Sequence, residues 1–152
     1  MTPGAINRRT VAEKVDLVRR MLDGIQRLPL ESFAAFSEDP RSAGAGESYL
    51  RRALEALFDL ARHVLAKGFG RAPAEYVVVA RQLGELGVVE APLAARLVLM
   101  ARYRNRMVHF YDEITDEELF GILTRETGDI EQTISAITQW MSSNPERVVR
   151  GD

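Results

Sequence analysis

The segment RYRNRMVHFYDE, residues 102–113, brings together side chains that phosphodiester chemistry requires. Imidazole donates and accepts protons near neutral pH, and guanidinium groups bind phosphate oxygens and stabilise developing negative charge. His109 follows Arg102, Arg104 and Arg106 within a few residues. The combination suits a phosphodiester that is cleaved by attack of its own 2′-hydroxyl, with His109 transferring the protons.

Helical spacing separates the three arginines. In a helix, Arg102, Arg106 and His109 would share one face, whereas Arg104 would fall on the apolar stripe. That stripe consists of Leu97, Met100, Val108 and Tyr111. An arginine there has to be paired, or has to lie where a second subunit or a ligand anion meets the helix. The alternative is a solvated helix end, at which the macrodipole favours each cation by about 0.3–1 kcal/mol.

Composition limits the other kinds of site. The chain has 152 residues, 46% hydrophobic and 28% charged, so we expect a single domain over 1–152, with a core from about 10 to 141 and short flexible tails. It has no cysteine and two histidines, which argues against a metal site. The formal net charge is −2, so any nucleic-acid site must be a local patch. Without an apolar run of roughly 20 residues or an apolar signal segment, we expect a cytoplasmic protein that contacts no membrane.

The apolar spacing of the first half predicts two helices. The capping box TVAE at 10–13 starts the first helix, whose apolar stripe covers 11–25. A loop-like stretch, DPRSAGAGE at 39–47, separates it from the second helix, which is expected to end at Gly68.

The second half predicts one shorter and two long helices. The shorter helix covers 73–87 and includes the β-branched run 76–80, because an isolated strand would have no partner. Pro92 starts the next helix, which is expected to continue through the arginine–histidine segment. A second capping box, TDEE at 115–118, starts a last helix whose core face extends to Met141. The chain is therefore predicted to be all-α, an up-down bundle of four main helices plus a shorter one.

The string RNRMVHFY, residues 104–111, resembles the signature of HEPN-domain proteins, specifically the HepT-like toxins paired with minimal nucleotidyltransferase antitoxins. That signature is arginine, a polar residue, three further residues, histidine, any residue and tyrosine. The order of YLRRALEALFDLARHVLAKG, AEYVVVARQLGELGVV, the motif and YDEITDEEL also follows the family, from about residue 47 to residue 140. The first 45 residues match only loosely.

The resemblance implies a dimer in which the motifs of two subunits form one cleft with metal-independent endoribonuclease activity. The resemblance implies that His109 is the general acid and base. Arg104 would bind the scissile phosphate, and Asn105 would orient the site. The dimer also answers a geometric difficulty, because Arg104 and His109 would be about 140° apart on one continuous helix. A two-fold interface adds a second copy of each residue.

The resemblance also implies partners and a modification. Tyr111 stands where the antitoxin of this toxin type transfers AMP and so silences the nuclease. The expected partners are RNA as substrate, the nucleotidyltransferase antitoxin, and a second copy of the chain, in an assembly that can grow larger with the antitoxin. ATP and Mg²⁺ would belong to the antitoxin, and the chain itself would need no cofactor. Arg102 and Arg106 are candidates for RNA binding.

Two other classes of function remain open from the sequence. The chain could be a non-catalytic helical binding or regulatory subunit of a minimal nucleotidyltransferase, or a structural dimerisation bundle. In the structural case the arginines would be solvated cations, with Arg104 salt-bridged at the interface. The other histidine, His63, is interpreted as a packed or surface helix residue rather than a second catalytic group.

Overall fold

Seven α-helices account for most of residues 4–109 and 114–151, which are the residues that the computed structural model describes. They are α1 (Arg8–Gln26), α2 (Phe33–Glu38), α3 (Pro40–Phe69), α4 (Tyr76–Glu85), α5 (Ala91–Met107), α6 (Asp116–Arg125) and α7 (Gly128–Ser143). A 3₁₀ turn, η1 (Pro145–Arg147), and two short strands, β1 (Ile6–Asn7) and β2 (Val148–Val149), complete the described elements. The prediction of an all-α fold is confirmed, although the helices are more numerous than expected.

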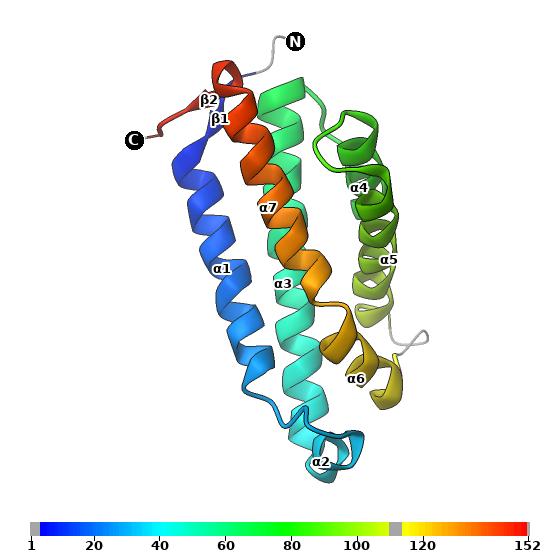
Figure 1. Ribbon diagram of the computed structural model, residues 1–152. Coiled ribbons are helices and arrows are strands. Elements are labelled where there is room, and N and C mark those ends of the chain that lie inside the picture. Colours follow the sequence, from blue (N-terminus) through cyan, green and yellow to red (C-terminus); the bar gives the residue numbers. More distant parts are fainter. Residues whose placement is uncertain (1–3, 110–113, 152) are drawn as a thin grey trace.

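The long helix α3 is the centre of the bundle. Helices α1 and α7 lie along it on one side, and the α4–α5 hairpin packs beside it on the other (Figure 1). Its buried residues include Leu50, Leu54, Leu57, Phe58 and Ala61, so it is apolar on more than one face. A helix surrounded by neighbours has to be apolar in this way.

The prediction of a loop at 39–47 is wrong, because α3 begins at Pro40. The Asp39 carboxylate accepts from the Arg41 backbone N–H at 2.9 Å, and proline fits the first turn of a helix. Gly46 is small for a packing reason: a Cβ there would lie 2.7 Å from Leu123 Cδ1 on α6. At the other end Gly70 caps α3 in the left-handed conformation, with φ 67°, whereas the predicted cap Gly68 is buried within the helix.

The first helix starts earlier than its predicted capping box. Asn7 is the N-cap of α1, and its side chain accepts from the backbone N–H of Thr10 at 3.0 Å. Thr10 is therefore inside the helix, and Glu13 pairs with Arg9 at 3.2 Å. Asn7 also belongs to β1, which pairs in parallel with β2 near the end of the chain. This pairing of the two termini sets where α1 begins.

The predicted last helix is divided into α6 and α7 between Arg125 and Gly128. Its start is as predicted, because the Thr115 hydroxyl accepts from the Glu118 backbone N–H at 3.1 Å. The predicted core residues of both parts are buried: Leu119, Ile122, Leu123, Ile130, Ile134, Ile137 and Met141. The break lets α6 pack against α2 and α3 while α7 packs against α3 and α5.

The β-branched run 76–80 is helical as predicted and starts α4, three residues after Pro73. Gly87, with φ 75°, lies in the turn to α5, and Pro92 is in the first turn of α5. None of the helices in the described part of the chain is long and apolar enough to cross a membrane.

Candidate active site

Helix α5 ends before it reaches His109. Val108 is its C-terminal cap, and the His109 backbone N–H donates to the Arg106 carbonyl at 3.2 Å. Val108 is 43% exposed and so leaves the core stripe on which it was placed. The expected helix through the whole segment is therefore wrong, and the 140° separation of a continuous helix does not apply. Tyr111 lies outside the described residues.

Arg104 is held inside its own subunit. Its Cζ atom lies 4.7 Å from the centroid of the Tyr76 ring on α4. Its Nε atom is 3.7 Å from the Glu55 carboxylate on α3, and its terminal nitrogen donates to the Asn105 side-chain oxygen at 3.3 Å. The arginine on the apolar stripe thus has an intrachain pairing, so the stripe alone does not require a second subunit. Burial, followed by the charge of Asp59, raises the pKa of the Tyr76 hydroxyl.

Arg106 has a structural contact that the sequence did not reveal. Its two terminal nitrogens donate to the two Glu118 carboxylate oxygens at 2.8 and 2.9 Å. These hydrogen bonds lower the pKa of Glu118 and tie the end of α5 to the first turn of α6. A bidentate pair of this kind is specific in geometry. To bind RNA, Arg106 would therefore have to release Glu118.

The other arginines of α5 differ in their surroundings. Arg102 is exposed and has no ion-pair partner among the residues that the structure describes. Arg96 is paired, because its Nε donates to Asp129 at 2.9 Å and a terminal nitrogen donates to Gln132 at 3.0 Å. Of the two RNA-binding candidates, Arg102 is thus more available to a ligand than Arg106.

Two cavities flank the end of α5. Arg104 and Asn105 line one of about 350 Å³, together with Arg62 and Tyr76. The exposed His109 lines the other, of about 360 Å³, with Arg106 and residues of α3 and α6. Within the described part of a single chain, Arg104 and His109 therefore do not open into the same cavity.

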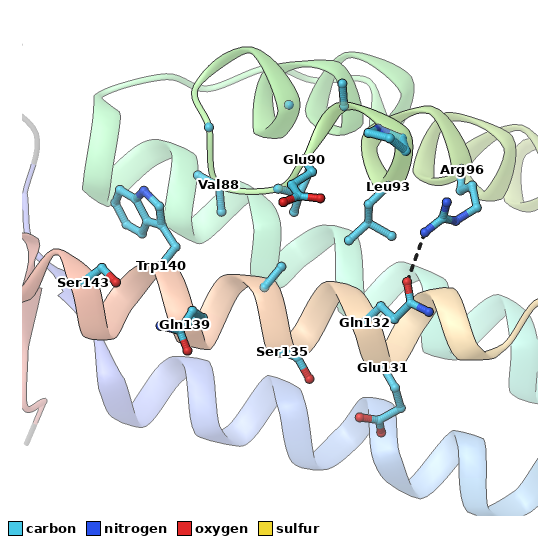
Figure 2. A pocket seen from close by; sticks show the side chains of 16 residues that line it. Val88, Glu90, Leu93, Arg96, Glu131, Gln132, Ser135, Gln139, Trp140 and Ser143 are labelled. Atoms are coloured by element: carbon cyan, nitrogen blue, oxygen red, sulfur yellow. Dashed lines mark hydrogen bonds between the residues drawn. The ribbon is translucent and has the colours of Figure 1, made fainter.

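A larger cavity of about 960 Å³ lies between α7 and the turn that joins α4 to α5 (Figure 2). It is lined by Leu93, Gln139 and Trp140 among others, and the paired Arg96 stands at one end. None of the motif residues that the structure describes lines this cavity, so the candidate site cannot be identified by cavity volume. Elsewhere too, residues 4–109 and 114–151 offer no group of three or more His, Cys, Asp or Glu placed to hold a metal ion.

His63 has a structural place, as predicted. Its Nε2 accepts from the backbone N–H of Asn7 at 3.0 Å, which joins α3 to β1. Burial, followed by the charges of Lys67 and Lys14, lowers its pKa. The neutral imidazole is the form that can accept this hydrogen bond.

Sequence reasoning missed the residues that hold Arg104 in place. Glu55 and Tyr76 come from α3 and α4, far from the motif along the chain, as does Arg62, which shares the Tyr76 ring. The one available signal was spacing: Glu55, Asp59 and Arg62 are four and three residues apart and so form a polar face on an otherwise apolar helix.

The comparisons with known proteins agree with this architecture. The family model described as Ribonuclease HepT-like matches residues 16–137. One similar solved structure is a toxin–antitoxin complex with AMP-PNP, at 22% identity and a TM-score of 0.79, covering 87% of this chain and 99% of that one. Another is the tri-AMPylated Shewanella oneidensis HEPN toxin in complex with MNT antitoxin, at 23% identity and a TM-score of 0.78, covering 86% and 97%. The cytosolic protein YutE of Bacillus subtilis, of unknown function, is 14% identical with a TM-score of 0.78, covering 95% and 98%. None of the curated proteins matches the sequence.

Proposed function

Since the chain belongs to the HepT-like ribonuclease family, we propose that it is a metal-independent endoribonuclease toxin of a toxin–antitoxin pair. It would cleave RNA through Arg104, Asn105 and His109. The observation that carries the proposal is the state of Arg104. Its guanidinium is fixed on the Tyr76 ring at the edge of an open cavity, and its Nε atom is buried without a hydrogen-bond partner among the residues that the structure describes.

The chemistry requires a proton acceptor, a proton donor and a cation. The 2′-oxygen attacks phosphorus as imidazole takes its proton, the bond from phosphorus to the 5′-oxygen breaks, and that oxygen receives a proton. The products are a 2′,3′-cyclic phosphate and a 5′-hydroxyl. Arg104 would stabilise the charge that develops on the phosphate oxygens, and Asn105 would orient the guanidinium through the hydrogen bond at 3.3 Å.

The active unit would be a homodimer. In one chain Arg104 and His109 line separate cavities, and a two-fold axis would bring the motif of each subunit toward the other. The outer face of α5 supports this arrangement, because Pro92, Ala95 and Leu99 lie along it and are exposed, Leu99 by 45%. This apolar stripe would be covered by the second copy.

A nucleotidyltransferase antitoxin would silence the enzyme by transferring AMP to Tyr111. The modification would add bulk and a negative charge two residues along the chain from His109. RNA phosphate would then be excluded both sterically and electrostatically.

The proposal is tested by incubating the purified chain with RNA, with and without EDTA. Cleavage should survive the chelator and leave 2′,3′-cyclic phosphate ends or their hydrolysed form. His109→Ala and Arg104→Ala should each lower the rate by about 10²–10⁴. Arg81→Ala, which removes an exposed arginine of α4, is the matched control and should cleave normally. Cleavage that disappears with EDTA and returns with Mg²⁺ would overturn the mechanism, and a chain that binds the nucleotidyltransferase without cleaving RNA would support a regulatory subunit instead.

A further inference from the structure

A second arginine, Arg62 of α3, shares the cavity of Arg104. Its Cζ atom lies 4.6 Å from the centroid of the Tyr76 ring, close to the 4.7 Å of Arg104. The ring itself is fixed, because it stacks on the buried Phe58 with centroids 4.9 Å apart and an interplanar angle of 14°. Two guanidinium groups from different helices are thereby held on one rigid platform.

Both arginines have hydrogen-bonding capacity to spare. The Nε atoms of Arg62 and Arg104 are buried, and neither has a hydrogen-bond partner within residues 4–109 and 114–151. Buried polar groups of this kind are rare in folded proteins and need an explanation. Arg106, by contrast, is occupied by two short hydrogen bonds to Glu118. The unused donors are thus a property of the Tyr76 pair.

The nearby carboxylates neutralise this pair only loosely. Arg62 is 3.6 Å from Asp59, and Arg104 is 3.7 Å from Glu55. Charge-assisted hydrogen bonds to carboxylates are about 2.7–2.9 Å long, and Glu55 makes one such bond with Arg51 instead, at 2.9 Å. A further carboxylate, Glu75, lines the cavity from an exposed position, and the Arg62 guanidinium also donates to the Ala74 carbonyl.

We infer that Arg62 and Arg104 form a two-arginine site for a phosphate group of bound RNA, in which Arg62 positions the substrate. The inference rests on the proposed function and adds a residue from outside the arginine–histidine motif. The planar guanidinium fork suits the paired oxygens of a phosphate. Tyr76 supports the two cations, and Phe58 packs against its ring.

The test measures RNA affinity against salt concentration with a labelled single-stranded oligonucleotide. All variants carry His109→Ala, so that the RNA stays intact. Arg62→Gln should weaken binding about 10-fold, as expected for one charge-assisted contact, and should reduce the slope of log affinity against log salt by about 0.7. Arg62→Lys keeps the charge but lacks the guanidinium fork, so its RNA affinity should lie between that of Arg62→Gln and that of the parent.

The matched control is Arg52→Gln, which removes an exposed arginine from the same helix, well away from the cavity. Its affinity should stay within about twofold of the parent. A purely structural role for Arg62, through the Ala74 carbonyl, would lower the melting temperature without changing the salt slope, and that result would overturn the proposal. If Arg62→Gln does not fold, Arg62→Lys decides by affinity instead of slope, because lysine keeps the charge and loses only the fork: weaker RNA binding than in the parent supports the site, and unchanged affinity overturns it.

A second measurement separates this inference from the proposed function. In ¹⁵N-labelled protein, inorganic phosphate should shift the Nε–Hε signals of Arg62 and Arg104 and leave that of Arg52 unmoved. RNA cleavage together with unmoved signals and an unchanged salt slope in Arg62→Gln would reject the two-arginine site alone. Shifted signals in a protein that does not bind RNA would reject both the RNA assignment and the nuclease, and would leave only an anion site.

Discussion

Gly84→Ala tests the close packing that holds the α4–α5 hairpin together. A Cβ at Gly84 would lie 2.7 Å from the Ala94 Cβ, a separation that real Cβ atoms essentially never show. Neither atom is the end of a flexible side chain, so the two helices would have to move apart. Overpacking of this kind costs about 1–3 kcal/mol, and the better helix propensity of alanine offsets at most about 1 kcal/mol. We expect a net loss of about 1–2 kcal/mol and a melting temperature lower by roughly 4 °C.

Gly44→Ala is the matched control, because Gly44 lies in α3 with nothing within 4 Å of its added Cβ. It should gain up to about 1 kcal/mol from helix propensity alone. The double variant Gly84→Ala/Ala94→Gly removes the clash, so the two changes should be coupled by at least about 0.5 kcal/mol. Denaturant unfolding at one protein concentration measures the parent, Gly84→Ala, Ala94→Gly, the double variant and the Gly44→Ala control. If Gly84→Ala stabilised the chain as much as Gly44→Ala does, or if the double variant showed no coupling, the packing argument would be refuted.

Three further outcomes are expected. Tyr111→Phe should abolish the mass increase of about 329 Da that the antitoxin, ATP and Mg²⁺ would add; an unchanged shift would show another modified residue. Glu118→Gln should lower stability at pH 7 by up to about 1 kcal/mol, and calorimetry should find the difference shrinking as pH falls below about 4.3, because Arg106 lowers the carboxylate pKa in the folded state. Burial lowers the pKa of His63 in the folded state, so the stability that the neutral imidazole contributes is complete above about pH 6.5 and is lost as pH falls. His63→Gln should therefore flatten the dependence of folding stability on pH below about 6.5, and an unchanged dependence would contradict the assignment.

The sequence predicts the helices well where an apolar stripe faces one partner. The core face from Leu119 to Met141 is buried as expected, and so is the stripe from Val11 to Ile25 except for the half-buried Val15. The start of α3 was missed because Ser42, Gly44 and Gly46 have the composition of a loop. Gly46 instead allows the close approach of α6, which is a tertiary requirement that composition does not distinguish from flexibility.

The candidate site was predicted only in part, for the same kind of reason. The motif residues Arg104 and Asn105 do line one cavity together, but the end of α5 before His109 could not be read from helical spacing. The Arg106–Glu118 contact depends on how α5 and α6 meet. The platform of Tyr76 likewise depends on the antiparallel register of α4 and α5, which places the start of one helix beside the end of the other.

The pairing of β1 with β2 has a consequence for the order in which the molecule opens. It joins Ile6 to Val148, so nearly the whole chain forms the loop that this short contact closes (Figure 1). Contacts between segments so distant in sequence close a long loop at a large cost in chain entropy, and they form late in folding. Two residue pairs offer little to offset it, so the strand pair should be among the first units to open in the native state. Ile6 and Asn7 should therefore be less protected from hydrogen exchange, relative to their intrinsic exchange rates, than amides in the middle of α3. The protection of Asn7 should fall further in acid, where a protonated His63 no longer accepts the Asn7 N–H.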